Sequence, residues 1–261
     1  MAYGKIRYEL ADGVALITLA DPATLNAISV EMTDELTDAF TRASAEARCV
    51  VLTGEGRGFS SGANLASGAP PLDADGKPDL GMRLEQTFNP FVGLLRDLPI
   101  PYVTAVNGVA AGIGCSFALL GDLIVAGESA YFLQAFRRIG LVPDGSATYH
   151  LPRMIGRARA MEMMLLGDKI PAKTALEWGL VNRCVSDAEL LPVAKALATE
   201  LANGPKALGL IRRLAWASLD NSWDEQLRAE RQAQREAGLS EDFREGVQAF
   251  FAKRPANFKG T

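Results

Sequence analysis

The chain contains little cysteine, one histidine and no long apolar segment. Cys49, Cys115 and Cys184 are the only cysteines in 261 residues, and their spacing matches no metal-ligand pattern. We therefore expect no disulfide, no metal site and a reduced, cytoplasmic location. No apolar run approaches the ~20 residues that span a bilayer, and residues 1–14 show neither a signal-peptide core nor an arginine-rich transit pattern, so we expect no membrane partner.

Positive charge is not in excess either. The formal net charge is −4, and 22% of the residues are charged. This balance gives no electrostatic reason to expect nucleic acid or an anionic membrane surface as a partner. At 261 residues and 48% hydrophobic composition, the chain is long enough for a large core in one α/β domain, with or without a smaller appendage.

Short β-type runs alternate with longer helical runs in the first part of the chain. Strands are predicted at residues 14–19, 49–53, 102–106 and 123–126. Ser29 can cap a helix whose apolar positions, Met32, Leu36, Ala39, Phe40 and Ala43, follow helical spacing. The alternation predicts a layered α/β domain. Residues 66–80, rich in Pro, Gly and Asp, are predicted to form a mobile loop.

The chain turns helical after about residue 190. We therefore expect a core at residues 1–190 and a helical region at 191–261 that serves in oligomerisation or as a lid. Ser222 and Glu225 form a capping-box pattern. An apolar stripe near the end is expected to pack on the body or on another subunit, and consists of Phe243, Val247, Phe250 and Phe251.

Two glycine-rich turns follow predicted strands, at residues 56–65 (GRGFSSGANL) and 107–122 (NGVAAGIGCSFALLGD). Glycine lets a ligand approach the main chain, and the first N–H groups of a helix have no partner within the helix. Neither turn has the order of a phosphate loop or of a dinucleotide-binding loop. If both face one pocket, their amides could form an oxyanion hole for an enolate or a tetrahedral intermediate. The sequence alone leaves that convergence open.

Taken together, several motifs are similar to those of the crotonase superfamily, the enoyl-CoA hydratases and isomerases. The matching segments lie at residues 19–29 (LADPATLNAIS), 58–65 (GFSSGANL), 101–132, 138–185 and 253–261 (KRPANFKGT). The resemblance covers nearly the whole chain. It implies a crotonase-like α/β spiral of ββα turns with a helical C-terminal region, assembled as a homotrimer or as a hexamer of two trimers.

The resemblance also implies an acyl-CoA thioester substrate and no cofactor besides the coenzyme A it carries. By motif position, the thioester oxygen would lie between the backbone N–H groups of Ala63 and Ile113, and Ile113 would narrow the acyl cavity. The resemblance places further substrate contacts at Leu25, Asn26, Ala27, Asn64, Leu65, Gly112, Ser116 and Phe136, with Phe258 and Lys259 reaching in from a neighbouring subunit.

Departures from the family pattern bear on the chemistry. The hydratases of the family use two glutamates, and this chain has Ser116 and Phe136 at those two positions. Phenylalanine cannot transfer a proton, and serine is a poor base without a partner. Asp144, in the segment IGLVPDGSATY (139–149), matches the lone acid of family isomerases, including those acting on ring-opened or epoxidised phenylacetyl-CoA. The resemblance thus favours a Δ3 to Δ2 enoyl-CoA isomerase with Asp144 as proton shuttle.

Alternatives remain open at this stage. Asp144 could be an ordinary turn or helix-capping residue, or a nucleophile as in dehalogenation of halobenzoyl-CoA, for which His150 is the one available histidine. A hydratase-like enzyme, or an acyl-CoA-binding oligomer without catalysis, is also compatible with the pattern. Structural roles are expected for Asp122, Cys115, His150 and the methionines at 161, 163 and 164. Glu85 is expected to face solvent, with a place at the pocket as the alternative. Tyr131, Phe132 and Phe136 could line the acyl pocket or belong to the core.

Overall fold

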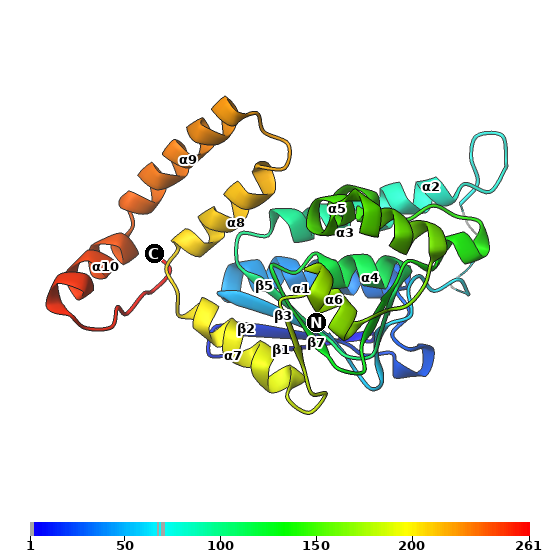
Figure 1. Ribbon diagram of the computed structural model, residues 1–261, viewed down its shortest axis with the longest axis horizontal. Coiled ribbons are helices and arrows are strands. Elements are labelled where there is room, and N and C mark those ends of the chain that lie inside the picture. The colour runs from blue at the N-terminus through cyan, green and yellow to red at the C-terminus, as the bar shows by residue number, and fades with distance from the viewer. Residues whose placement is uncertain (1–2, 67, 69–70) are drawn as a thin grey trace.

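Two sheets form the centre of the structure, a computed structural model that describes residues 3–66, 68 and 71–261 (Figure 1). The larger sheet has the order β1-β2-β3-β5-β7-β10, and the smaller has the order β4-β6-β8-β9. Among the strands of the described residues, only the pairs β1–β2 and β8–β9 are antiparallel. The strands are β1 (Ile6–Ala11), β2 (Val14–Leu19), β3 (Cys49–Gly54), β4 (Gly58–Ser60), β5 (Tyr102–Val106), β6 (Val109–Ala111), β7 (Leu123–Gly127), β8 (Tyr131–Leu133), β9 (Ile170–Pro171) and β10 (Arg183–Val185).

Helices cover both faces of the larger sheet and extend beyond it (Figure 1). The α-helices are α1 (Val30–Glu46), α2 (Leu80–Arg83), α3 (Asn89–Asp97), α4 (Gly112–Leu119), α5 (Ala147–Leu166), α6 (Ala172–Trp178), α7 (Leu190–Ala202), α8 (Ala207–Ala217), α9 (Trp223–Gly238) and α10 (Glu241–Ala252). Short 3-10 turns span Pro22–Thr24 and Ala135–Ile139, and a π-helical turn spans Leu84–Phe88 between α2 and α3.

A repeated two-strand unit builds the spiral. In the pairs β3–β4, β5–β6 and β7–β8, the first strand joins the larger sheet and the second joins the smaller one. A helical segment follows each pair. It returns the chain to the larger sheet after the first two pairs, and after β8 the chain first adds β9 to the smaller sheet and then reaches β10. This arrangement is the spiral of ββα turns expected from the sequence, and the predicted fold class is confirmed.

Alternate side chains of the central strands face two different cores, as the two-residue period of a strand requires. Val50 and Leu52 of β3 belong to the core that also contains side chains of α1, α3 and α4. Cys49 and Val51 belong to the core that contains the apolar side of α7. Helix α7 packs on the larger sheet, whereas α8–α10 project away from it (Figure 1). The division of the chain into two regions at residue 190 stays a prediction.

The local predictions are confirmed with small changes at the ends. The strands at 14–19 and 102–106 have those bounds, while β3 and β7 each run one glycine further, to Gly54 and Gly127. Ser29 caps α1 by accepting a hydrogen bond from Met32 N at 3.1 Å. The capping box of Ser222 and Glu225 starts α9.

The structure also describes most of the predicted loop at 66–80 and the predicted apolar stripe on α10. The loop at 66–80 includes residues 67, 69 and 70, which lie outside the described residues; its described part contains a β-bridge between Leu72 and Pro78. The stripe on α10 does not pack on the body, since Phe250 and Phe251 are 78% and 77% exposed. No helix in the described part of the chain is both long and apolar enough to cross a bilayer.

Candidate active site

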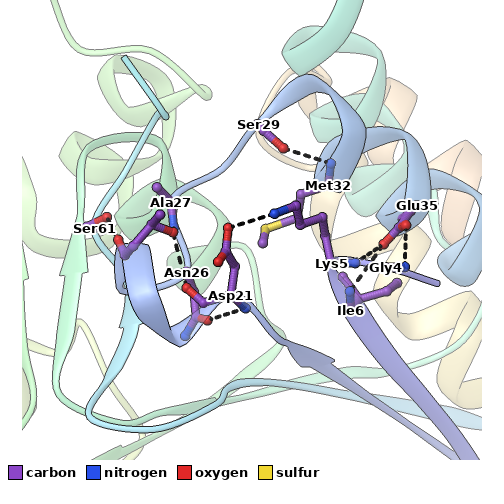
Figure 2. Close-up of polar contacts among 11 residues, drawn as sticks. Gly4, Lys5, Ile6, Asp21, Asn26, Ala27, Ser29, Met32, Glu35 and Ser61 are labelled. Atoms are coloured by element: carbon purple, nitrogen blue, oxygen red, sulfur yellow. Dashed lines mark hydrogen bonds and ion pairs between the residues drawn. The ribbon is translucent and has the colours of Figure 1, made fainter. Parts of the chain in front are cut away.

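The first wall of the candidate site is built by the segment after β2. Leu25 and Asn26 both have a φ of 55°, which turns the chain sharply before α1. The buried Asn26 amide donates to Glu55 O at 3.0 Å and Gly58 O at 2.8 Å, and its Oδ1 accepts from Asp21 N at 2.9 Å. Figure 2 shows the contact with Asp21, together with the ion pair between Asp21 and Lys5. Asn26 therefore joins this segment to the end of β3 and the start of β4.

This segment aligns the first glycine turn. Ile28 N donates to Gly62 O at 2.8 Å, and Asn64 N donates to Ile28 O at 2.8 Å. Ala63 lies between these two bonds, and its own N–H has no acceptor among the described residues. Gly62 has a φ of +99°, and a Cβ there would lie 2.9 Å from Ala111 O. The turn therefore requires glycine at residue 62 to present the Ala63 amide.

The second glycine turn starts α4. Gly112 has a φ of +52°, and Ile113 follows it in the first turn of the helix, where N–H groups have no partner within the helix. The Ile113 N–H also has no acceptor elsewhere among the described residues. A Cβ on Gly112 would lie 3.8 Å from the Gly62 Cα. The two glycine turns thus meet, which the sequence alone could not establish.

Asp144 belongs to the loop between the Ala135–Ile139 turn and α5. Its carbonyl accepts from Ala147 N at 3.1 Å and from Ser116 Oγ at 3.0 Å. Its side chain caps no helix, because the N-cap of α5 is Ser146, and Asp144 Oδ1 is buried without a hydrogen-bond partner among the described residues. Burial raises the pKa of the Asp144 carboxyl to about 7. The backbone forms a turn here, but no other residue in the described part of the chain donates a hydrogen bond to the carboxylate.

A cavity of about 490 Å³ brings these groups together. Ala63, Ile113 and Asp144 all line it, and Asp144 is the only acidic side chain among its described lining residues. Two cations, Arg83 and Arg138, also line the cavity, and Arg138 donates to Gly167 O at 2.7 Å. The remaining side chains are mostly apolar. The arrangement can therefore hold an apolar group, offer two N–H donors to an oxygen and move a proton at one carboxylate.

The predicted contact residues divide into two sets. Those that line the cavity are Ala63, Asn64, Leu65, Gly112, Ile113, Phe136 and Asp144. Those that do not are Leu25, Asn26, Ala27, Ser116, Phe258 and Lys259.

Three of the residues that do not line the cavity make hydrogen bonds that stabilise the fold. The Asn26 side chain is fully engaged by backbone groups, and Ser116 is buried with its hydroxyl on the Asp144 carbonyl. The Ser116 hydroxyl donates to the loop and not into the cavity, so its predicted contact with substrate stays a prediction. Lys259 N donates to the Asp242 carboxylate at the start of α10. The C-terminus lies beside α8 and α10, across the molecule from the cavity-lining α2 (Figure 1). Phe258 and Lys259 therefore do not meet this cavity within one chain.

Several other candidates have structural roles. Asp122 accepts from Arg212 Nε at 2.7 Å and from Tyr102 N at 2.8 Å. Cys115 is buried, and this burial raises the pKa of its thiol to about 12, so it is no nucleophile at neutral pH. His150 is buried against Ser146 Oγ, at 3.0 Å from Nδ1, and burial lowers its pKa to about 4.

The remaining candidates lie in the core or on the surface, outside the cavity lining. Glu85 is exposed and does not line the cavity. Phe132 and Met163 belong to the core, Met164 packs against it and Met161 is half-buried. Tyr131 is half-buried in β8 and does not line the cavity.

The apolar wall opposite the glycine turns was missed from the sequence. Leu80, Leu84 and Phe88 supply one side of it, and Leu141 and Val142 supply another. The spacing of the first three residues is that of one helical face, which was the available signal. The π-helical turn at Leu84–Phe88 carries two of them, and such turns occur frequently at functional sites.

Comparisons with known proteins agree with this geometry. A family model for enoyl-CoA hydratase/isomerase matches residues 9–261. A relative from Rhodobacter capsulatus, named "Probable enoyl-CoA hydratase", is 45% identical over 261 residues and covers 100% of both chains. The 1,2-epoxyphenylacetyl-CoA isomerase of Escherichia coli is 45% identical over 252 residues, with 95% of each chain covered. A crystal structure of an enoyl-CoA hydratase from Bacillus anthracis superposes with a TM-score of 0.90 at 29% identity, covering 99% of this chain and 100% of that one.

Proposed function

The chain belongs to the enoyl-CoA hydratase/isomerase family, and we propose that it is an isomerase that moves a carbon–carbon double bond of an acyl-CoA thioester. The observation that carries this proposal is the single carboxylate, Asp144, in an apolar cavity that also presents two unpaired amides. An isomerase needs one group that takes a proton from one carbon and returns it to another.

The proposed reaction converts a Δ3-enoyl-CoA into a Δ2-enoyl-CoA. The Asp144 carboxylate removes a proton from C2, and the electron pair moves onto the thioester oxygen to form a dienolate. The Ala63 and Ile113 N–H groups donate to this oxygen. The carboxyl then returns the proton to C4, so the double bond moves from C3–C4 to C2–C3. A carboxyl pKa of about 7 supports this role, because both protonation states are then accessible near neutral pH.

Positions 116 and 136 support isomerisation over hydration. Ser116 is buried beneath the Asp144 loop, and Phe136 presents an aromatic ring to the cavity. Neither can activate water as a carboxylate does. Hydration stays the second candidate, because the Rhodobacter capsulatus relative bears the name of a hydratase.

The Escherichia coli relative suggests a substrate range. Its name assigns it an epoxidised phenylacetyl-CoA. We propose that aromatic and ring-derived acyl-CoA esters be tested beside straight-chain ones. The two phenylalanines on the cavity wall, Phe88 and Phe136, are compatible with a flat ring.

Assembly and location are also proposed. The exposed apolar side of α10 supports a homotrimer or hexamer, since a lone chain would leave several large side chains in water. The three free cysteines, two of them buried, are compatible with a reducing cytoplasm. Coenzyme A would enter only as part of the substrate.

Asp144→Asn tests the proposed reaction. We expect kcat on a 3-enoyl-CoA to fall by roughly 10²- to 10⁴-fold, because the amide cannot carry the proton. Binding of the CoA ester should be nearly unchanged, since the two amides remain. Glu85→Gln is the matched control, as it removes an exposed carboxylate next to the cavity wall and should keep full activity. Full activity of Asp144→Asn would reject the proposal.

Two further assays separate the alternatives. Hydration of a 2-enoyl-CoA faster than isomerisation of a 3-enoyl-CoA would assign the chain to the hydratases. A covalent adduct on Asp144, seen by mass spectrometry after mixing with a halobenzoyl-CoA, would assign a nucleophilic reaction. Binding of CoA esters without turnover of any of these substrates would indicate a non-catalytic acyl-CoA-binding protein.

A further inference from the structure

The Asp144 carboxylate receives no hydrogen bond from another residue in the described part of the chain. Its Oδ1 is buried and unpartnered among the described residues. A carboxylate that no other residue binds takes its position from its own backbone. The position of the carboxylate therefore depends on what fixes the loop at residues 140–146.

Ser116 makes one side-chain contact to this loop. Its hydroxyl donates to the Asp144 carbonyl at 3.0 Å, and the serine itself is fully buried. Ser116 lies three residues after Ile113 on α4, and residues with this spacing share one face of a helix. One face of α4 thus carries both the Ile113 residue and the hydroxyl that holds Asp144.

The loop lies directly on these two residues. A Cβ on Gly145 would lie 2.5 Å from Ile113 Cδ1 and 2.6 Å from Ser116 Cβ. Only glycine allows the loop to approach α4 this closely.

The loop also has an unfavourable backbone conformation. Gly145 and Ser146 have φ values of 58° and 65°, and the second is a costly conformation for a residue with a side chain. Such a turn persists only where tertiary contacts hold it. The Ser116 hydroxyl is one such contact, and the pair Ser146–His150 is a second one.

We propose that Ser116 is a positioning residue for the proton transfer, which fixes the Asp144 carboxylate relative to the Ile113 amide by anchoring the Asp144 carbonyl to α4. The proposal rests on the proposed function of Asp144. The hydratases of the family have a glutamate at this position. This chain has Ser116 there, and its hydroxyl donates to the backbone carbonyl of Asp144, the proposed proton carrier. Ser116 touches no substrate in this account.

Ser116→Ala is the test, with Thr104→Val as its matched control. Thr104 is also fully buried, and its hydroxyl also donates to a carbonyl of α4, that of Ala118, at 2.8 Å. Both variants lose one buried hydrogen bond to a backbone carbonyl, so both should lose comparable thermal stability. Only Ser116→Ala loosens the Asp144 loop.

We expect Ser116→Ala to lower kcat on a 3-enoyl-CoA by about tenfold or more, since small misplacements of a reacting group are costly. KM should stay near the wild-type value. The acidic limb of the pH profile of kcat/KM should move to lower pH, because a loosened carboxyl gains contact with water. Thr104→Val should keep the kcat and the pH profile of the wild type.

Three outcomes would overturn the inference. They are a wild-type kcat in Ser116→Ala, an equal loss of activity in both variants, and a rise in KM with an unmoved pH profile. If Ser116→Ala does not fold, Ser116→Cys keeps the volume with a weaker donor and should show the same changes at smaller size. Asp144→Asn is measured alongside. Full activity of Asp144→Asn would reject the proposed function. An inactive Asp144→Asn together with a fully active Ser116→Ala would reject only the role of Ser116.

Discussion

Gly62 and Gly112 bring the two amide-bearing turns into contact, because a Cβ on Gly112 would lie 3.8 Å from the Gly62 Cα. The two glycines are 50 positions apart in the sequence and follow different strand pairs of the spiral. Their approach brings Ala63 and Ile113 to the wall of the same cavity. The geometry of the proposed oxyanion hole therefore depends on two residues without side chains.

Gly62→Ala tests this dependence. The new Cβ would lie 2.9 Å from Ala111 O, so the turns must separate. We expect kcat to fall by roughly 10- to 100-fold, short of the loss from removing a donor altogether. Gly179→Ala is the matched control, since Gly179 also has a positive φ but would place its Cβ in open space beyond α6. Gly179→Ala should lose roughly 1–2 kcal/mol of stability through its backbone conformation, and Gly62→Ala should lose at least as much. Equal activity in the two variants would contradict the prediction.

The Asp144 carboxyl should make folding stability depend on pH. Its pKa of about 7 in the folded protein lies above the ordinary value of 3.8. Its contribution to stability is therefore present below pH 3.8 and is lost as the pH rises through 7. Asp144→Asn removes this loss, and we expect it to raise the free energy of unfolding by about 2 kcal/mol at pH 8, allowing for partial solvent exposure. Urea denaturation at pH 5 and 8 measures this; a variant less stable at pH 8 would contradict it.

Titration of His150 should change folding stability with pH in the opposite direction to Asp144. Burial lowers its pKa from 6.5 to about 4, so the protein keeps the full stability of neutral His150 above pH 6.5 and loses it as the pH falls toward 4. This loss amounts to about 3 kcal/mol. We expect His150→Asn to flatten this part of the stability profile, measured by thermal unfolding across pH 4 to 7. An unchanged slope would show that His150 does not titrate in this way.

The exposed side of α10 should determine assembly. Phe250 and Phe251 are largely exposed, and their ring centroids lie 5.6 Å apart. We expect Phe250→Ser combined with Phe251→Ser to yield monomers in analytical ultracentrifugation, because burial of these rings would supply association energy. Leu176→Ser, an exposed apolar residue on α6, is the control and should leave the assembly unchanged. A monomeric wild-type chain would reject the proposed trimer or hexamer.

Local features of the fold were predictable from the sequence because their causes are local. The apolar periodicity after Ser29 and the capping box at Ser222 each involve a few neighbouring residues, and both are confirmed. The strands at 14–19 and 102–106 were likewise predicted with their observed bounds. The spiral came from the resemblance of several motifs, since strand order is a long-range property.

The site was predictable only in part. Asp144 and the two glycine turns were identified as candidates, but their convergence depends on contacts between segments far apart in the chain. The task of Ser116 was not predictable, because a buried serine can donate to any nearby carbonyl. The wall at Leu84 and Phe88 was missed because their helical spacing also suits an ordinary core.

The measurement that tests the central claim most directly is the fate of the C2 hydrogen in a single turnover. A 3-enoyl-CoA carrying deuterium at C2 is converted in ordinary water, and the product is examined by mass spectrometry and NMR. If Asp144 carries the proton, part of the deuterium appears at C4 in the wild-type product, and Asp144→Asn shows almost no conversion. A C4 hydrogen drawn entirely from solvent, together with undiminished turnover by Asp144→Asn, would contradict the account.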